Sequence, residues 1–153
     1  MMSTKRKGNV GEAKVIADLL AQGIEVTLPF GDNLPFDLIA VGPDLRLWKV
    51  QVKFASAHQG VIRIKNWRQS ENTQRRYERS YTSTQVDVFA VYCPDTDLVY
   101  YVSQREIAQK AAFHLRITPA KNQQIVGVHW HEDYRSFRDA SETTSSGPEM
   151  VKT

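Results

Sequence analysis

The sequence predicts a single domain with a sheet of the mixed α/β or α+β class. Three observations support this fold class. The chain has 153 residues, which suits one domain with one sizeable core. One segment near the start has the 3- to 4-residue apolar spacing of a helix. Several short segments after it alternate apolar and polar residues, as half-buried strands do.

The first predicted element is a helix over residues 9–22. Gly23 is a plausible end signal. Gly11 inside this helix costs about 1 kcal/mol relative to Ala, so we expect another element to pack close to it. The apolar positions that carry the helical spacing are Val10, Ala13, Ile16, Ala17 and Leu20.

A group of strands follows the helix. Residues 24–30, 36–41 and 45–54 are predicted strands, and Gly42-Pro43-Asp44 is a turn between the last two. A fourth strand is expected over 61–65.

The second half of the chain continues the mixed pattern. Ser103-Gln104-Arg105-Glu106 has the capping-box pattern that opens a helix, which we expect to run to about residue 113. From about residue 140 the chain is rich in Ser, Thr and Gly, so one domain over 1–139 and a disordered tail over 140–153 are predicted. The other expected elements are strands at 86–93 and 98–102, a strand pair at 115–118 and 125–130, and a short helix at 132–137.

The predicted hairpin of residues 36–54 carries polar residues in unusual places. Side chains alternate along a strand, so Gln51 and Lys53 point to the same side. Leu45 and Leu47 share that face, which suggests that it is partly covered. Asp37 falls in an apolar strand, where Asp is disfavoured, and a carboxylate there usually has a partner or a function. A solvent-facing polar face is the alternative interpretation of the same pattern.

Composition bounds the function class. No apolar run approaches the ~20 residues needed to span a bilayer, and no apolar signal core follows the basic N-terminus. Cys93 is the only cysteine, so a disulfide within the chain is impossible. We therefore expect an intracellular protein (cytoplasm or nucleoid) with no membrane partner.

Positive charge is concentrated in residues 61–82. The net charge of +3 is too small to demonstrate nucleic-acid binding, but Arg and aromatic residues interleaved in one segment suit phosphate contacts with some stacking. A solvated surface helix or loop is the alternative. The candidate DNA-binding residues here are Arg63, Lys65, Trp67, Arg68, Arg75, Arg76 and Arg79.

A second candidate DNA contact is the predicted turn Lys121-Asn122-Gln123-Gln124. Amide side chains can bond adenine edges in the major groove. A polar hairpin turn explains the same residues without a function.

Three motifs in order resemble the PD-(D/E)XK nuclease superfamily. They are Lys7-Gly8-Asn9-Val10-Gly11-Glu12, Pro35-Phe36-Asp37 and Gln51-Val52-Lys53. Within that superfamily the chain is similar to the small homing endonucleases encoded by bacterial group I introns, over roughly residues 7–102. The resemblance implies a mixed sheet flanked by helices, with the catalytic residues on a central hairpin and the N-terminal helix, and Mg²⁺-dependent hydrolysis of double-stranded DNA.

The resemblance also implies a role for each motif residue. Glu12 corresponds to the helix acid that contacts the metal directly or through water, and Asp37 to the chief metal ligand. Gln51 occupies the position of the second motif acid and becomes a third candidate ligand. Lys53 corresponds to the lysine that orients or activates the attacking water and offsets charge on the phosphorane.

Gln51 departs from the family pattern. Unit charges ~4 Å apart at an effective dielectric of ~20 interact by about 4 kcal/mol, so an amide in place of a carboxylate weakens metal attraction. An amide oxygen can still ligate a hard cation. The site either binds metal less tightly, with Glu12 supplying charge, or is inactive in a DNA-binding remnant.

Other functions remain open on the sequence alone. A restriction endonuclease or a Holliday-junction resolvase would use the same core, and a non-catalytic DNA-binding module or a plain structural domain would use none of its chemistry. Cutting both strands of a duplex calls for two copies of one active site, so at least a dimer is expected. The resemblance suggests a tetramer built as a dimer of dimers.

Overall fold

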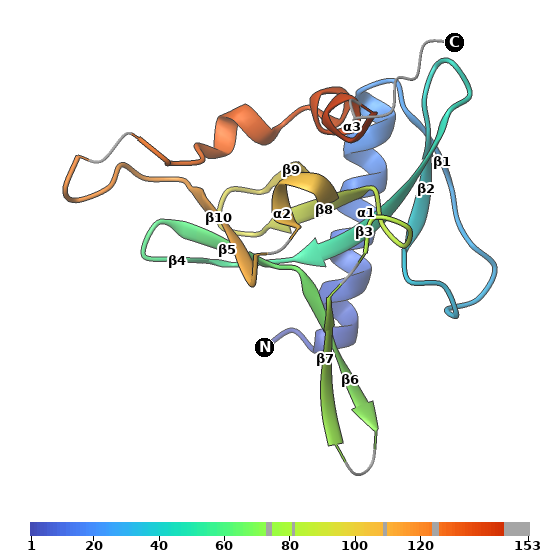
Figure 1. Cartoon of the computed structure of the whole chain (residues 1–153), viewed down its shortest axis with the longest axis horizontal. Helices are drawn as coiled ribbons and strands as arrows, with labels where there is room; N and C mark the ends of the chain where they lie inside the picture. Colours follow the sequence, from blue (N-terminus) through green and yellow to red (C-terminus); the bar gives the residue numbers. More distant parts are fainter. Residues whose placement is uncertain (73–74, 81, 109, 124–125, 146–153) are drawn as a thin grey trace.

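A computed structural model describes residues 1–72, 75–80, 82–108, 110–123 and 126–145, with the backbone alone for the residues between 67 and 80 and for 144–145. The architecture is the predicted mixed α+β fold (Figure 1). A five-stranded sheet lies at the centre, with helices on one face and a smaller sheet on the other.

The central sheet has the strand order β1-β2-β3-β8-β9. Neighbouring strands are antiparallel except β3 and β8, which run parallel. The bounds of its strands are β1 Glu25–Thr27, β2 Leu38–Val41, β3 Leu47–Phe54, β8 Val88–Cys93 and β9 Leu98–Ser103. The sheet thus brings the predicted hairpin β2–β3 beside the most apolar strand of the chain.

Helix α1, Thr4–Ala21, covers one face of this sheet (Figure 1). It begins five residues earlier than the apolar spacing predicted, because the Ser3 side chain caps its first turn by accepting a hydrogen bond from the Arg6 amide. Val15 and Leu19 are fully buried against the sheet. Helix α3, Phe137–Ser145, joins the same core.

The C-terminal helix replaces part of the predicted tail. We expected disorder from residue 140, but Ala140 and Ser141 are buried within α3. Apolar contacts of Phe137 and Ala140 with the core order the segment despite its Ser/Thr-rich composition. The predicted short helix at 132–137 is instead a 3-10 turn, η1 His131–Tyr134, followed by α3. Residues 146–153 lie outside the described part of the chain.

A three-stranded sheet, in the order β10-β5-β4, packs on the other face of the central sheet. Its strands are β4 Ala57–His58, β5 Val61–Lys65 and β10 Ala112–Arg116. Ile62 and Ile64 of β5 point inward with Phe113 and Leu115 of β10, and pack against Phe89 of β8. A layer on each face explains why all six residues of β8 are buried.

Two predictions in this region are wrong. The helix opened by Ser103 is only four residues long (α2, Gln104–Ile107), and Phe113 belongs to β10. The predicted pair of strands at 115–118 and 125–130 reduces to a single bridge between Arg116 and Trp130, since β10 pairs with β5. The alternation of buried Phe113 and Leu115 with outward His114 explains the strand.

Two further strands, β6 Trp67–Asn72 and β7 Arg75–Ser80, form an antiparallel hairpin after β5. Figure 1 shows this hairpin leaving the body of the molecule. The segment predicted as basic and DNA-binding is therefore built of strands, neither a surface helix nor a plain loop.

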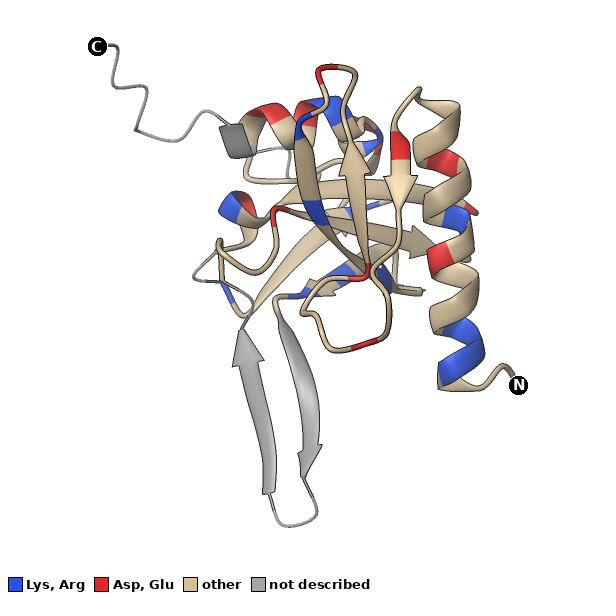
Figure 2. Cartoon of the chain, turned by 90° about the vertical axis from the view of Figure 1, so that its right-hand side faces the viewer, with Lys and Arg blue, Asp and Glu red and all other residues tan. Residues whose placement is uncertain are grey.

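The hairpin β2–β3 is packed beside α1, and its end near the turn is exposed to solvent. Figure 2 views it with α1 alongside and with no helix in front of its strands. Leu45 and Leu47, which suggested a covered face, are 79% and 63% exposed. Within the described residues, no helix is long and apolar enough to cross a membrane.

Candidate active site

Asp37 lies at the point where β2 begins, one residue before the strand rather than inside it. Two bonds hold it against β3. Its amide donates to the Val50 carbonyl at 2.9 Å, and its carboxylate oxygen Oδ2 accepts from the Val52 amide at 2.8 Å. The carboxylate thus lies at the start of β2, and the Val52 amide of β3 fixes its orientation.

Gln51 and Lys53 follow on the face of β3 turned toward the second sheet. The parallel register places Gln51 beside Phe89 of β8, and the Lys53 ammonium lies 5.6 Å from the centre of the Phe89 ring. Gln51 Nε2 donates to the Val52 carbonyl at 3.4 Å, a long bond that orients the amide. Both side chains are half-buried.

Glu12 approaches from the opposite face, on α1. The preceding residue, Gly11, is buried where α1 meets β3. A Cβ added at Gly11 would lie 3.6 Å from Val52 Cγ1 and from Phe54 Cβ. The close packing predicted from Gly11 is confirmed. It brings Glu12 within electrostatic range of Asp37.

Asp37 is thus the electrostatic partner that the other two charged groups share. It interacts electrostatically with Glu12 from the helix side and with Lys53 from the side of the second sheet. The structure therefore links Asp37 to Glu12 and to Lys53, and Gln51 lies between Val50 and Val52, the two residues of β3 that bond Asp37.

Burial governs the protonation of the two acids. It raises the pKa of Glu12 above its ordinary value, and the charge of Asp37 raises it further. Burial also raises the pKa of Asp37, against the opposing effects of the Val52 amide and the Lys53 ammonium. Two partly desolvated carboxylates that disfavour each other's charge form a site that a cation would stabilise.

The Lys53 ammonium is disfavoured in the same way. Burial lowers the pKa of Lys53 from 10.5 to about 8, and the charge of Lys65 lowers it as well. The charge of Asp37 opposes this shift, but burial outweighs it. At neutral pH the side chain stays mostly protonated, since its pKa lies above 7.

The chemistry of these donors fits a hard divalent cation. Carboxylate oxygens of Asp37 and Glu12 and the amide oxygen of Gln51 are ligands of the kind that Mg²⁺ accepts. Two acids and one amide carry one negative charge fewer than the family pattern, which has an acid at the position of Gln51. In the described part of the chain, no group of three His, Cys, Asp or Glu side chains is arranged to hold a metal ion. Such a site would keep several waters on the ion.

The predicted DNA-binding residues fall into two places outside this site. Arg63 and Lys65 are exposed on β5, and the next five lie on β6 and β7, whose side chains are outside the description. Lys121, Asn122 and Gln123 are exposed in a turn after β10, closed by a bond from the Gln123 amide to the Ala120 carbonyl. Gln124 lies outside the described residues.

Sequence reasoning missed a residue that positions β3. Asp87 Oδ2 accepts from the Lys49 amide at 2.8 Å, and the Asp87 amide donates to the Lys49 carbonyl at 2.9 Å. These bonds fix the register of β3 against β8 two residues before Gln51. An Asp at the start of an apolar strand was the available signal.

Comparison with known proteins gives two findings. The family model described as PD-(D/E)XK endonuclease matches residues 2–137. The solved structure of the bacterial homing endonuclease I-Ssp6803I superimposes with a TM-score of 0.73 at 24% sequence identity, over 97% of this chain and 99% of that one. No curated protein gives a significant match.

Proposed function

Because the chain belongs to the PD-(D/E)XK endonuclease family, we propose that it is a Mg²⁺-dependent endonuclease that cleaves double-stranded DNA at a specific site. The observation that carries the proposal is that Asp37, whose carboxylate the Val52 amide holds, interacts electrostatically with both Glu12 and Lys53. The likeness in fold to a bacterial homing endonuclease supports homing as the biological role.

Each residue of the candidate site has its own role in the proposed hydrolysis. Asp37, Glu12 and the Gln51 amide would hold the ion, which when bound supplies Lewis-acid stabilisation of the phosphoryl oxygens. Lys53, whose ammonium interacts electrostatically with Asp37, would orient the attacking water and offset the negative charge that develops at phosphorus. Water forms the new bond to phosphorus as the bond to the leaving oxygen breaks.

In addition to its charge, Asp37 contributes a carboxylate whose orientation is fixed. The Val52 amide orients its carboxylate before substrate arrives, so less reorganisation is needed at the moment of reaction. Phe89 and its neighbours exclude water around Lys53, which strengthens each charge interaction there.

Cleavage of both strands requires two such sites, so we propose a symmetric dimer as the smallest active assembly and, by resemblance, a tetramer. Light scattering of the protein with and without duplex DNA would give the number of copies. A monomer on cleaved duplex would contradict this part of the proposal.

The decisive experiment incubates the protein with Mg²⁺ and a library of DNA sites and shapes, and sequences the cut ends. Discrete ends on linear duplex are expected. Ends confined to four-way junctions, or to short palindromes, would identify a resolvase or a restriction enzyme instead.

Two variants test the site itself. We expect Asp37→Ala and Lys53→Ala each to reduce cleavage by at least about 100-fold while DNA affinity is largely kept, because both remove charge stabilisation from the reaction rather than from binding. Asp32→Ala, which removes an exposed acid from the loop before β2, is the matched control and should cleave normally. Retained cleavage in either active-site variant would contradict the assignment.

A further inference from the structure

The outward side of the second sheet carries basic side chains and no acidic one. Side chains alternate across a strand, so the inward positions of β5 and β10 leave every second residue facing out. The antiparallel register pairs Arg63 with His114, Lys65 with Ala112, and Val61 with both Arg116 and His58. We call this surface the outer basic face. Its members are His58, Val61, Arg63, Lys65, Ala112, His114 and Arg116.

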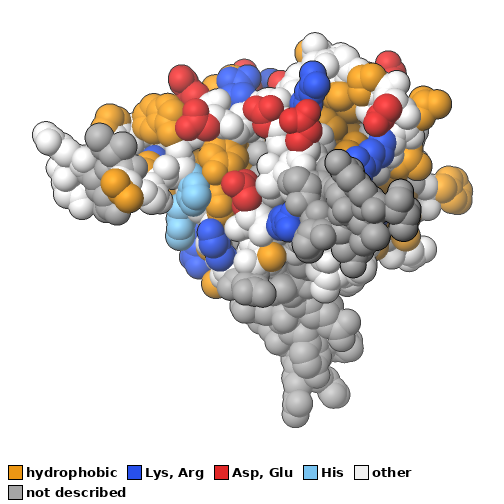
Figure 3. All heavy atoms as spheres, turned by 45° about the horizontal axis from the view of Figure 1, so that its top comes forward, with side chains coloured by type: hydrophobic (Ala, Val, Ile, Leu, Met, Phe, Trp, Pro, Cys, Tyr) orange, Lys and Arg blue, Asp and Glu red, His pale blue; other side chains and the backbone are white. Residues whose placement is uncertain are grey.

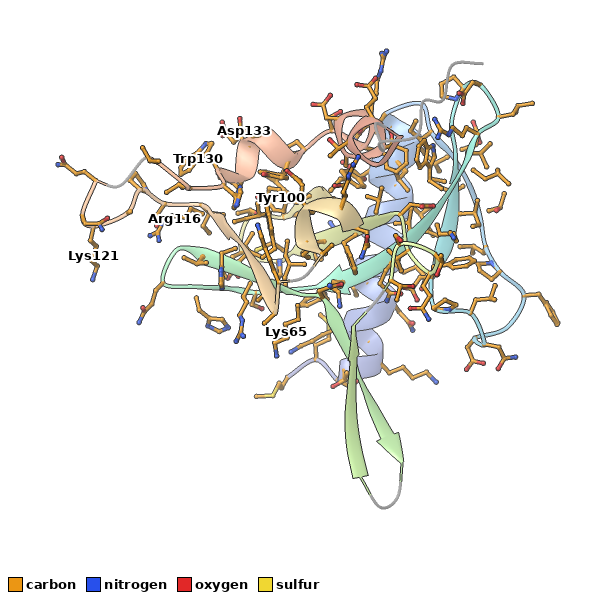
Figure 4. All side chains as sticks on the ribbon, viewed as in Figure 1. Lys65, Tyr100, Arg116, Lys121, Trp130 and Asp133 are labelled. Carbon is orange, nitrogen blue, oxygen red and sulfur yellow. The ribbon has the colours of Figure 1, made fainter. Side chains whose placement is uncertain are left out.

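The members of the outer basic face are basic or aliphatic, and none is acidic. Arg63, Lys65, His58 and His114 are exposed. Arg116 is half-buried, and its Nε donates to the Thr118 carbonyl at 3.1 Å, which restricts the side chain at the edge of the sheet. Lys65, Arg116 and Lys121 are labelled in Figure 4, with Lys65 at the base of the β6–β7 hairpin.

A shallow hollow extends the face beyond β10. Its lining adds Lys110 and His129 to Val61, His114 and Arg116, and contains no acid. Figure 3 shows histidine side chains next to Lys and Arg on one side of the molecule. The net charge of only +3 thus includes a local group of basic side chains on and beside this sheet.

The outer basic face extends to the base of the β6–β7 hairpin. Lys65 is the last residue of β5, and β6 begins two residues later. A polyanion lying along β5 would therefore reach the base of this hairpin.

We propose that the outer basic face, together with Lys110, binds the phosphate backbone of duplex DNA and positions it for cleavage. This inference rests on the proposed function and adds Arg116, His114, His58 and Lys110 to the residues that contact DNA. The contacts are to phosphates, so they fix orientation and contribute no sequence specificity.

A protein partner fits this surface less well. Protein interfaces place apolar and aromatic side chains at their centre and exclude charge from it. On the outer basic face the centre is the Arg63–His114 pair, and the apolar members are only Val61 and Ala112. A row of basic side chains without an apolar centre suits a uniformly charged polyanion.

The test measures the affinity for a fluorescent duplex in EDTA, where no cleavage occurs, over a series of salt concentrations. For Arg116→Gln we expect the slope of log affinity against log salt to become shallower by about 0.9, and the affinity to fall roughly three- to tenfold, which is the effect of losing one phosphate contact. Arg138→Gln removes an exposed arginine from α3 and should change neither quantity.

A gain of charge tests the same face without removing any contact. Ala112→Lys, on the outer basic face, is expected to steepen the salt slope by about 0.9, whereas Ala21→Lys, at the end of α1, is not. If neither Arg116→Gln nor Ala112→Lys differs from its control while the parent protein binds and cleaves DNA, this inference is wrong and the proposed function stands. If the parent protein neither binds nor cleaves DNA, both are wrong.

Discussion

Strands β3 and β8 are parallel neighbours in one sheet, yet they serve different purposes. All six residues of β8 are buried and apolar in character, and their contacts join the two cores. Strand β3 is buried on the α1 face alone and carries Gln51 and Lys53 on the other. The comparison shows stability concentrated in one strand, which lets its neighbour hold charges at half-buried positions that cost free energy.

The two strands also act on each other. Phe89 of β8 lies beneath the Lys53 ammonium, and the water it excludes contributes to the lowered pKa of Lys53. The apolar strand thus sets the electrostatics of the polar one. Substitutions on each strand can separate the contribution of β8 to stability from the effect of burial on the pKa of Lys53.

The largest expected effect comes from β8. Phe89 is fully buried, so Phe89→Ala should lower the free energy of unfolding by about 3–5 kcal/mol through lost burial and an unfilled cavity. Urea unfolding measures this. Phe30→Ala removes the same ring from a fully exposed loop position and should change stability by less than about 0.5 kcal/mol. Equal effects of the two variants would refute the assignment of stability to β8.

On β3 the expected effect is smaller and depends on pH. The unfolded chain binds a proton at Lys53 up to about pH 10.5 and the folded protein only up to about pH 8, so the unfolded state holds more protons in this window. The free energy of unfolding therefore gains a rising contribution from Lys53 between pH 8 and pH 10.5. Its total is at most roughly 3 kcal/mol.

Lys53→Met should lack that rise. Urea unfolding in EDTA at several pH values would show the difference between the parent protein and Lys53→Met changing across the window in favour of the parent. Lys49→Met, on the same face of β3, is the control and should leave the pH dependence in place. Parallel pH curves for the parent protein and Lys53→Met would show that Lys53 titrates as it does in water.

The contrast between the strands also explains what could be read from the sequence. The apolar run of β8 and the alternation of β3 are local signals, so both strands and the side that Gln51 and Lys53 share were predicted correctly. The meeting of Glu12 with Asp37 was implied only by the family motifs, because it depends on packing between α1 and the start of β2.

Long-range pairing is where the prediction failed. The capping box at Ser103 is real, but it opens only one turn of helix, and the tertiary pairing of β10 with β5 prevails over any continuation. The alternation Phe113-His114-Leu115-Arg116 was a usable signal of a strand. Its partner could not be identified from local pattern, and with it the outer basic face was missed.

A further test asks whether residue 51 of β3 binds the metal, by replacing Gln51 with the kind of acid that the family pattern has at this position. Gln51→Glu adds a third carboxylate beside Asp37 and Glu12, so the Mg²⁺ concentration for half-maximal cleavage should fall by about tenfold, equivalent to roughly 1.4 kcal/mol. Titration of Mg²⁺ in a cleavage assay measures this. Gln59→Glu adds the same charge at an exposed turn and should leave the metal requirement unchanged. An unaltered requirement in Gln51→Glu would place residue 51 away from the metal.

The smallest expected effect lies where α1 meets β3. Gly11→Ala should raise the free energy of unfolding by up to about 1 kcal/mol, because Ala favours the helix and its Cβ would meet Val52 and Phe54 at ordinary contact distance. Gly8→Ala gives the helical gain alone, since a Cβ there meets nothing within 4 Å. Urea unfolding of the two variants isolates the packing contribution. If Gly11→Ala is less stable than Gly8→Ala, or loses cleavage while it stays folded, the distance between α1 and β3 is tighter than these contacts indicate. Helix position would then control how Glu12 reaches Asp37.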